Sequence, residues 1–201
     1  DIMYADLNGD GEISNGANTL ADHGDISIIG NNTPRYNYGI TLDAAYKGFD
    51  FSVFFQGIGK RDYRVSGAYF WGATGGMWQS AGFTEHWDFF RGEDNPLGAN
   101  LNAYYPRPLF TSGKNMQTQS RYLQDASYLR MKNIQLGYTL PKSITSKAGM
   151  QSVRVYVSGD NLATFSSMSK IFDPETIGSD WGDDKLYPLS KTISVGLNVN
   201  F

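Results

Sequence analysis

Residues 191–201 read Lys-Thr-Ile-Ser-Val-Gly-Leu-Asn-Val-Asn-Phe, and this stretch decides the fold. Apolar side chains stand at every second position from Ile193 to Phe201, and small or polar residues stand between them. Because successive side chains of a β-strand point to opposite faces, the alternation predicts a strand with one apolar and one polar face.

The same alternation occurs in four earlier stretches, each bounded by Gly, Pro, Asn or Asp, whereas helical periodicity is nearly absent. These stretches are residues 36–46, 49–57, 128–140 and 152–162. Only Lys47 and Gly48 separate the first two, which predicts a tight hairpin. In the third, the apolar residues change phase near Asn133, which predicts either a bulge or a change of surroundings there. The sequence therefore predicts an all-β fold of five antiparallel strands.

The connections between these strands alternate between short and long. A structureless loop as long as residues 61–126 is uncommon in a globular domain, but outer-membrane barrels combine short periplasmic turns with long extracellular loops. If the last strand runs inward, every long segment falls outside the cell. We therefore expect extracellular loops at 1–35, 61–126 and 166–190, a barrel hairpin at 36–60, barrel strands joined by a short periplasmic turn at 127–165, and a C-terminal barrel strand at 191–201.

The composition excludes several classes of function. A net charge of −3 and a pI near 5.3 leave no basic footprint for nucleic acid. The chain has no Cys and only two His, and it lacks the GxSxG, HExxH and phosphate-loop motifs, so we expect no enzyme activity. It is instead rich in aromatic residues, at 14%, and poor in charged ones, at 18%.

An alternative to a barrel is a secreted calcium-binding β-sandwich that binds carbohydrate, whose apolar strand faces would be buried in a core. Tyr and Phe at the strand ends, such as Tyr46, Phe49 and Tyr138, favour a barrel, because aromatic girdles lie at both membrane interfaces. Five strands alone would leave open edges in lipid. On the barrel interpretation they complete a larger barrel surrounded by membrane lipid.

Several motifs along the chain, taken in order, resemble the C-terminal part of the SusC-like (SusC/RagA family) TonB-dependent outer-membrane transporters of Bacteroidota. They are Asp6-Leu7-Asn8-Gly9-Asp10-Gly11, Ile28-Ile29-Gly30-Asn31, Pro34-Arg35-Tyr36, Tyr46-Lys47-Gly48-Phe49-Asp50, the stretch from Tyr128 to Tyr138, Gly159-Asp160-Asn161-Leu162, Asp173-Pro174-Glu175, and Gly196-Leu197-Asn198-Val199-Asn200-Phe201.

The resemblance implies the last five strands of a transmembrane β-barrel of about 22 strands with an N-terminal plug. It also implies a SusD-like surface lipoprotein as partner, and TonB-energised uptake of oligosaccharide or peptide across the outer membrane. The plug and the segment that contacts TonB would lie upstream of Asp1. The terminal strand ending at Phe201 resembles the C-terminal signal read by the barrel-insertion machinery.

The acidic stretch near the start of the chain predicts a calcium site. Asp6, Asn8 and Asp10 occupy positions one, three and five of a calcium loop, Gly11 occupies position six, and the Glu12 carbonyl position seven. Ala17 stands at position twelve, where a bidentate acid is needed. We expect Asp25 to close the site after an insertion, with Asp22 in reserve. The alternative is an Asx-rich turn without metal.

The long loop holds three of the four tryptophans in the chain, namely Trp71, Trp78 and Trp87, and Trp181 lies in the last loop. Exposed aromatic faces stack on sugar rings and anchor protein interfaces. We therefore expect these residues to contact substrate or partner. The alternative, that they form the loop's own small core, stays open.

Overall fold

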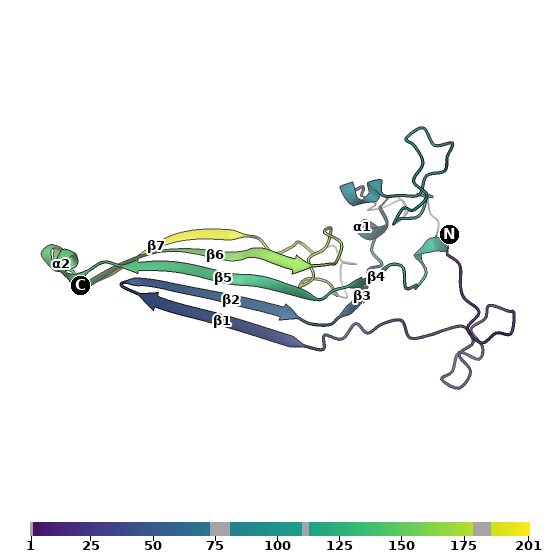
Figure 1. The fold of residues 1–201 in the computed structure, drawn as a ribbon, viewed down its shortest axis with the longest axis horizontal. Helices are drawn as coiled ribbons and strands as arrows, with labels where there is room; N and C mark the ends of the chain where they lie inside the picture. Colours follow the sequence, from purple (N-terminus) through teal and green to yellow (C-terminus); the bar gives the residue numbers. More distant parts are fainter. Residues whose placement is uncertain (1, 73–80, 110–112, 179–185) are drawn as a thin grey trace. The chain divides into compact units, whose positions relative to one another are not determined.

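The computed structural model describes residues 2–72, 81–109, 113–178 and 186–201. Its main element is a five-stranded antiparallel sheet in the order β1-β2-β5-β6-β7, and neighbouring strands lie side by side in Figure 1. The strands are β1 (Asn37–Tyr46), β2 (Phe49–Ile58), β5 (Tyr128–Thr139), β6 (Ser152–Ser166) and β7 (Thr192–Asn200). The predicted all-β fold and its antiparallel strands are confirmed.

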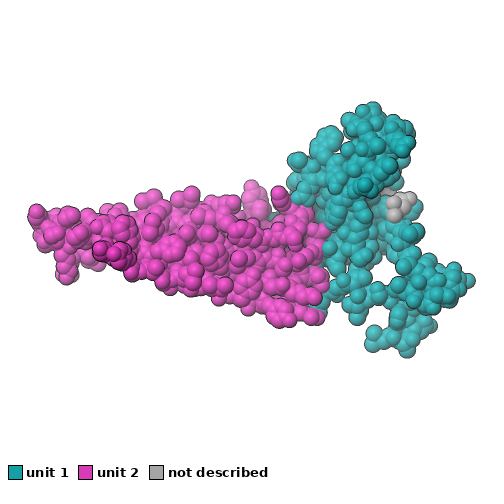
Figure 2. All heavy atoms as spheres, in the orientation of Figure 1, with its two compact units in different colours: residues 1–31, 63–123, 178–186 teal, residues 32–62, 124–177, 187–201 magenta. Residues whose placement is uncertain are grey.

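The chain divides into two compact units, coloured separately in Figure 2. Unit 1 comprises Asp1–Asn31, Tyr63–Leu123 and Gly178–Leu186, and unit 2, which contains the sheet, comprises Asn32–Asp62, Gln124–Ile177 and Tyr187–Phe201. Strands β3 (Asp62–Arg64) and β4 (Leu123–Asp125) form a second, two-stranded sheet. The short helices are α1 (Ala68–Trp71), η2 (Thr84–Trp87), η3 (Lys114–Met116), α2 (Lys142–Thr145) and η4 (Ser146–Ala148). Within the described residues, no helix has the length and apolar character needed to cross a membrane.

The turn between β1 and β2 has the tight geometry that its two-residue spacing predicts. Tyr46 pairs with Phe49, and both intervening residues have positive φ, 47° at Lys47 and 88° at Gly48. A type I′ turn requires positive φ at both central positions, and glycine adopts it without steric cost. The Gly48 carbonyl accepts a hydrogen bond from the Thr139 N–H at 2.7 Å, so the turn is also tied to β5.

The strand register separates an apolar from a polar face across all five strands. Most apolar residues pair with another apolar residue or with glycine on the neighbouring strand, and most polar residues pair likewise, with exceptions such as Phe54, which pairs with Thr41 and Asn133. One apolar row is Ala44, Phe51, Leu136, Val157 and Val195, and the neighbouring polar row is Asp43, Ser52, Gln135, Ser158 and Ser194. The sheet is therefore two-faced along its whole width.

The expected bulge in the third long strand is present. The pairing of β2 with β5 shifts register at Phe54/Phe55, and the pairing of β5 with β6 shifts between Met131 and Asn133. The shift keeps Met131 and Ile134 on the apolar face although three positions separate them in sequence. Because pairing resumes beyond the irregularity, β6 extends to Ser166, further than the predicted end at residue 162.

Much of the apolar face of the sheet is exposed, although Val53 and Val153 on it are buried. Val195 is 81% exposed, and Leu197, Ile193, Leu42 and Leu136 are also among the exposed large hydrophobic residues. A sandwich would bury this face in a core. An extended exposed apolar surface instead indicates contact with another protein or with a membrane.

Candidate functional site

The N-terminal acidic loop is folded around its own carboxylates. Asp6 accepts backbone N–H bonds from Gly9 at 2.6 Å and Gly11 at 2.9 Å. Asn8 Oδ1 accepts the Asp10 N–H at 3.0 Å, and Asp10 Oδ1 accepts the Glu12 N–H at 2.8 Å. These are Asx-type turns, in which a side-chain oxygen accepts a hydrogen bond from a backbone N–H a few residues further on. Such turns are compatible both with a calcium loop and with the alternative of an Asx-rich turn without metal.

Asp25, the expected closing acid, lies against both ends of this loop. Its Oδ1 accepts the Leu7 N–H at 2.6 Å and its Oδ2 accepts the Ser14 N–H at 2.8 Å. These backbone hydrogen bonds, first from Ser14 and then from Leu7, hold the pKa of the Asp25 carboxyl below its ordinary value. Asp22, the reserve candidate, instead accepts the N–H of Ala17 in its own turn.

The oxygen-only donor set of this loop suits calcium, which binds carboxylates, side-chain amides and backbone carbonyls. Within the described ranges, however, no three Asp, Glu or His side chains are grouped closely enough to hold a metal ion. The five predicted ligands, Asp6, Asn8, Asp10, Asp25 and the Glu12 carbonyl, would therefore have to move closer together to hold a calcium ion. Calcium binding stays a prediction.

The long loop of unit 1 encloses an aromatic core. Phe70 and Trp71 of α1 are 0% and 5% exposed, and they pack edge-on against Tyr122, with ring centroids 6.0 and 4.9 Å apart. The ring centroid of Tyr105 lies 5.5 Å from that of Phe70. Burial raises the pKa of the Tyr122 phenol. This arrangement favours the alternative for Trp71, that it packs inside the loop.

Of the predicted contact tryptophans, Trp87 at the end of η2 is the exposed one that the structure describes. Its side chain is 63% exposed, and Phe83 and Leu97 nearby in sequence are exposed too. Trp78 and Trp181 lie outside the described residues. The contact role of these tryptophans stays a prediction, with Trp87 as its most accessible member.

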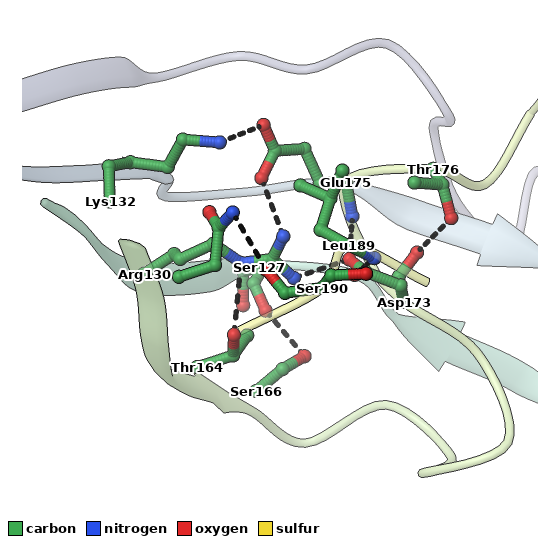
Figure 3. A network of polar contacts seen from close by, with 11 residues as sticks. Ser127, Arg130, Lys132, Thr164, Ser166, Asp173, Glu175, Thr176, Leu189 and Ser190 are labelled. Carbon is green, nitrogen blue, oxygen red and sulfur yellow. Dashed lines mark hydrogen bonds and ion pairs between the residues drawn. The ribbon is translucent and has the colours of Figure 1, made fainter. Parts of the chain in front are cut away.

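The sequence did not predict the charged network shown in Figure 3, which joins β5 to the segment after β6. Arg130 Nη2 contacts Asp173 Oδ1 at 2.5 Å, and Arg130 Nη1 contacts Glu175 Oε2 at 2.9 Å. Lys132 Nζ contacts the other oxygen of Glu175 at 2.8 Å. Arg130 Nε donates to Thr164 Oγ1 at 2.9 Å. The network therefore ties residues 173–175 to two strands of the sheet.

The central pair of this network is buried. The Arg130 and Asp173 side chains are 3% and 6% exposed, whereas Glu175 and Lys132 are both 23% exposed. Burial alone would raise the pKa of Asp173, but the N–H of Glu175, the Arg130 guanidinium and the N–H of Leu189 donate hydrogen bonds that lower it below its ordinary value. Both halves lie in motifs that carried the family resemblance, but nothing in the sequence predicted that they meet.

A second ion pair lies on the polar face near the β1–β2 turn. Arg154 of β6 reaches across β5 to Asp50 of β2, with Arg154 Nε 2.8 Å from Asp50 Oδ2, and Arg154 Nη2 also donates to Gln135 at 2.9 Å. The guanidinium lies 4.9 Å from the centroid of the Tyr156 ring. A side chain at Gly137 would collide with this pair, which accounts for glycine there. Through its bonds to Asp50 and Gln135, Arg154 therefore links β6 to β2 and β5.

The C-terminal residue, Phe201, follows β7 and is 83% exposed. Figure 1 places it at the same end of the sheet as α2. Its role as an insertion signal stays a prediction.

The sequence is similar along its whole length to TonB-dependent receptors of Formosa agariphila. It is 34% identical to TonB-dependent receptor P3 over 99% of this chain and 31% identical to TonB-dependent receptor P26 over 98%. In both cases the chain spans 19% of the relative's own length. A scan against protein-family models finds no match.

Two solved structures share the fold. The RagAB peptide importer in its open-open state matches with a TM-score of 0.62 and 26% identity over 90% of this chain and 18% of that chain. The RagAB peptide transporter matches with a TM-score of 0.63 and 27% identity over 87% of this chain and 18% of that chain. Together with the two-faced sheet and the Formosa relatives, these matches show that the chain belongs to the SusC-like TonB-dependent receptors of the outer membrane.

Proposed function

We propose that the chain forms part of the barrel wall and outer loops of a TonB-dependent nutrient importer, which takes up glycan or peptide with a SusD-like lipoprotein. The observation that carries the proposal is the two-faced sheet, whose apolar face has exposed large hydrophobic side chains on all five strands. Support also comes from relatives named as TonB-dependent receptors and from the fold of the RagAB peptide importer. The importer acts by conformational change, without catalysis by this chain.

The sheet suits a wall between lipid and an aqueous lumen. Its apolar rows would face the acyl chains, and its polar rows, with the Asp50–Arg154 pair, would face the lumen. The edge strands β1 and β7 carry backbone groups that need partner strands in lipid, because an unpaired amide there costs several kcal/mol. In the importer those partners are other strands of the same barrel.

On this proposal the short turns at residues 47–48 and 141–151 face the periplasm, and unit 1 lies outside the cell. Substrate would be captured between the outer loops and the lipoprotein, and TonB pulling on the plug would open the lumen. The exposed apolar face counts against the secreted-sandwich alternative. Phe201 would then lie at the periplasmic end, where the insertion machinery binds the last strand.

The proposal predicts that the native receptor, purified in detergent and examined by native mass spectrometry, carries a surface lipoprotein. Trp87→Ala should weaken this association, because a large exposed aromatic residue at an interface centre contributes about 2 kcal/mol, roughly a 30-fold change in affinity. Trp87→Phe, which keeps an aromatic ring, serves as the control. A receptor that never carries a lipoprotein would refute the importer assembly. Equal affinity in the Trp87→Ala variant would show that Trp87 does not contact the lipoprotein, and it would leave the importer assembly in place.

We also propose that Asp6, Asn8, Asp10, Asp25 and the Glu12 carbonyl bind a structural calcium ion that stiffens residues 2–31. Chelation by EGTA should then accelerate proteolysis of this segment in the native receptor, and added calcium should reverse the effect. Asp10→Asn should abolish the response, because it removes a charged ligand and keeps a turn-forming side chain. Asp22→Asn, which alters only its own turn, is the matched control. Proteolysis that is insensitive to chelation would rule the calcium site out.

A further inference from the structure

Unit 1 contains a cavity lined by two arginines and no acidic residue. Its volume is about 630 Å³, and its charged lining residues are Arg107 and Arg121. Three tyrosines line it as well, namely Tyr104, Tyr105 and Tyr122. A concave site lined by cationic groups and aromatic rings suits an anionic ligand with a planar or apolar part.

Arg121 is held in place at this cavity by backbone carbonyls. Its Nη2 donates to the Ala103 carbonyl at 2.5 Å and its Nε donates to the Tyr104 carbonyl at 3.3 Å. Its guanidinium also lies 5.9 Å from the centroid of the Tyr122 ring. Carbonyl oxygens orient a guanidinium without cancelling its charge. The cation is therefore both positioned and available.

Neither arginine of the cavity forms an ion pair within the part of the chain that the structure describes. The ion pairs of Arg130, Lys132 and Arg154 with acids lie in unit 2. Arg107 is exposed, as is Arg121. Two guanidinium groups without an acidic partner line the same cavity, so an anion bound there would be attracted to both.

A second groove, of about 820 Å³, adjoins this cavity. The two share Ile2, Gln119 and Arg121 as lining residues, so Arg121 lies where they meet. Asp25 is the acid that lines this second groove, and its carboxylate is bonded to the backbone of Leu7 and Ser14. The adjoining grooves offer room for an elongated ligand whose anionic group lies at the arginines.

We infer that the cavity binds a carboxylate carried by an elongated ligand, with Arg107 and Arg121 on the carboxylate and the tyrosine rings against the adjacent part of the ligand. This inference rests on the proposed function, because it places a charge-selective subsite in the outer loops of the importer. The carboxylate has two possible sources, the C-terminal carboxylate of a peptide or a uronic acid of an oligosaccharide. A hydrogen bond to a charged group is strong enough that each arginine should contribute about tenfold to affinity.

The test is calorimetric titration of the native receptor in detergent with four probes. These are N-acetyl-tetraalanine with a free carboxylate, its C-terminal amide, trigalacturonate, and its methyl ester. At least one acidic probe should bind more tightly than its neutral counterpart, and that probe identifies the source of the carboxylate. Arg107→Gln and Arg121→Gln should each weaken the acidic probe about tenfold and leave the neutral one unchanged.

Arg91 provides a matched control in the same unit. It also donates to two backbone carbonyls, those of Gly98 and Trp87, both at 2.9 Å, but it does not line the cavity. Arg91→Gln should therefore leave the charge preference intact. Arg107→Gln keeps the test decisive if Arg121→Gln disturbs the loop, because the Arg107 side chain forms no hydrogen bond or ion pair with the described residues.

Three results would overturn the inference: no binding of either acidic probe, equal binding of acidic and neutral forms, or unchanged binding in the Arg107→Gln variant. Failure of the proposed function gives a different result. A receptor that carries a lipoprotein and imports oligomers without charge preference disproves the subsite alone, whereas a receptor that imports nothing and carries no lipoprotein disproves the importer itself.

Discussion

Arg130→Met is expected to release the segment after β6 from the sheet. The substitution keeps an apolar stem but leaves the buried Asp173 carboxylate without its guanidinium partner. Removing one member of a buried ion pair costs about 3 to 5 kcal/mol, because the remaining charge stays desolvated. Without Arg130, Asp173 and Glu175 also repel each other. The segment should therefore open locally.

Hydrogen exchange of the native receptor measures this release directly. The Leu189 N–H bonds to Asp173 Oδ2 at 3.0 Å and the Glu175 N–H to Asp173 Oδ1 at 3.0 Å. An opening that becomes easier by 3 kcal/mol or more should accelerate exchange of both amides by roughly a hundredfold. Lys132→Gln is the control, since its side chain is partly exposed and contacts only Glu175 in the network, and it should have a small effect. Unchanged exchange in Arg130→Met would contradict the role assigned to the network.

The same network sets the direction of a pH effect. The pKa of Asp173 is lowered in the folded protein, so its contribution to stability is fully present above the ordinary aspartate pKa of about 4. That contribution is lost as the pH falls through the lowered value. The difference in exchange between the unsubstituted receptor and Arg130→Met should therefore shrink in acid, and it should be constant near neutrality.

Val195→Arg is expected to block folding of the receptor into membranes. Val195 lies near the middle of β7, on the apolar face, where it pairs with Val157. An arginine on the lipid face of a barrel costs about 2 to 4 kcal/mol at the bilayer midplane. Ser194→Arg, one residue away on the polar face, places the same charge beside Ser158 and should be tolerated. The matched pair separates the effect of the face from that of the charge.

Folding into liposomes, followed by heat-modifiable gel mobility, reports this difference. The Val195→Arg variant should give much less folded receptor than Ser194→Arg at equal protein concentration. Equal yields from the two variants would mean that the apolar face does not meet lipid.

The sheet could be predicted from the sequence because alternation alone fixes which residues share a face. The alternation from Ile193 to Phe201 predicts the last strand. Lys47 and Gly48 predict the turn between β1 and β2, and the phase change near Asn133 predicts the bulge in β5. All three signals are local. The extension of β6 to Ser166 was not predicted. It arises because β6 pairs with β5 again beyond the register shift, and this pairing depends on the sequence of β5 as well as on that of β6.

The remaining features depend on contacts between distant residues. Arg130 and Asp173 are separated by 43 positions, and no period or motif relates a strand arginine to a loop aspartate. The burial of Trp71 depends on Tyr122, which approaches it from the far end of the long loop. The contact of Asp25 with both ends of the acidic loop is the exception, because the calcium motif lacks an acid at position twelve and Asp25 stands just before the Ile28-Ile29-Gly30 stretch. Its role as a calcium ligand stays a prediction.

The central claim is that the five-stranded sheet is a lipid-facing barrel wall, and spin labels along β7 test it most directly. The chain has no cysteine, so a single cysteine at each position from 192 to 200 gives a unique label in this part of the receptor. In bilayers, labels at Ile193, Val195, Leu197 and Val199 should be accessible to dissolved oxygen, and the intervening labels to a water-soluble nickel reagent. Accessibility without this two-residue alternation, or with its phase reversed, would contradict the barrel-wall account.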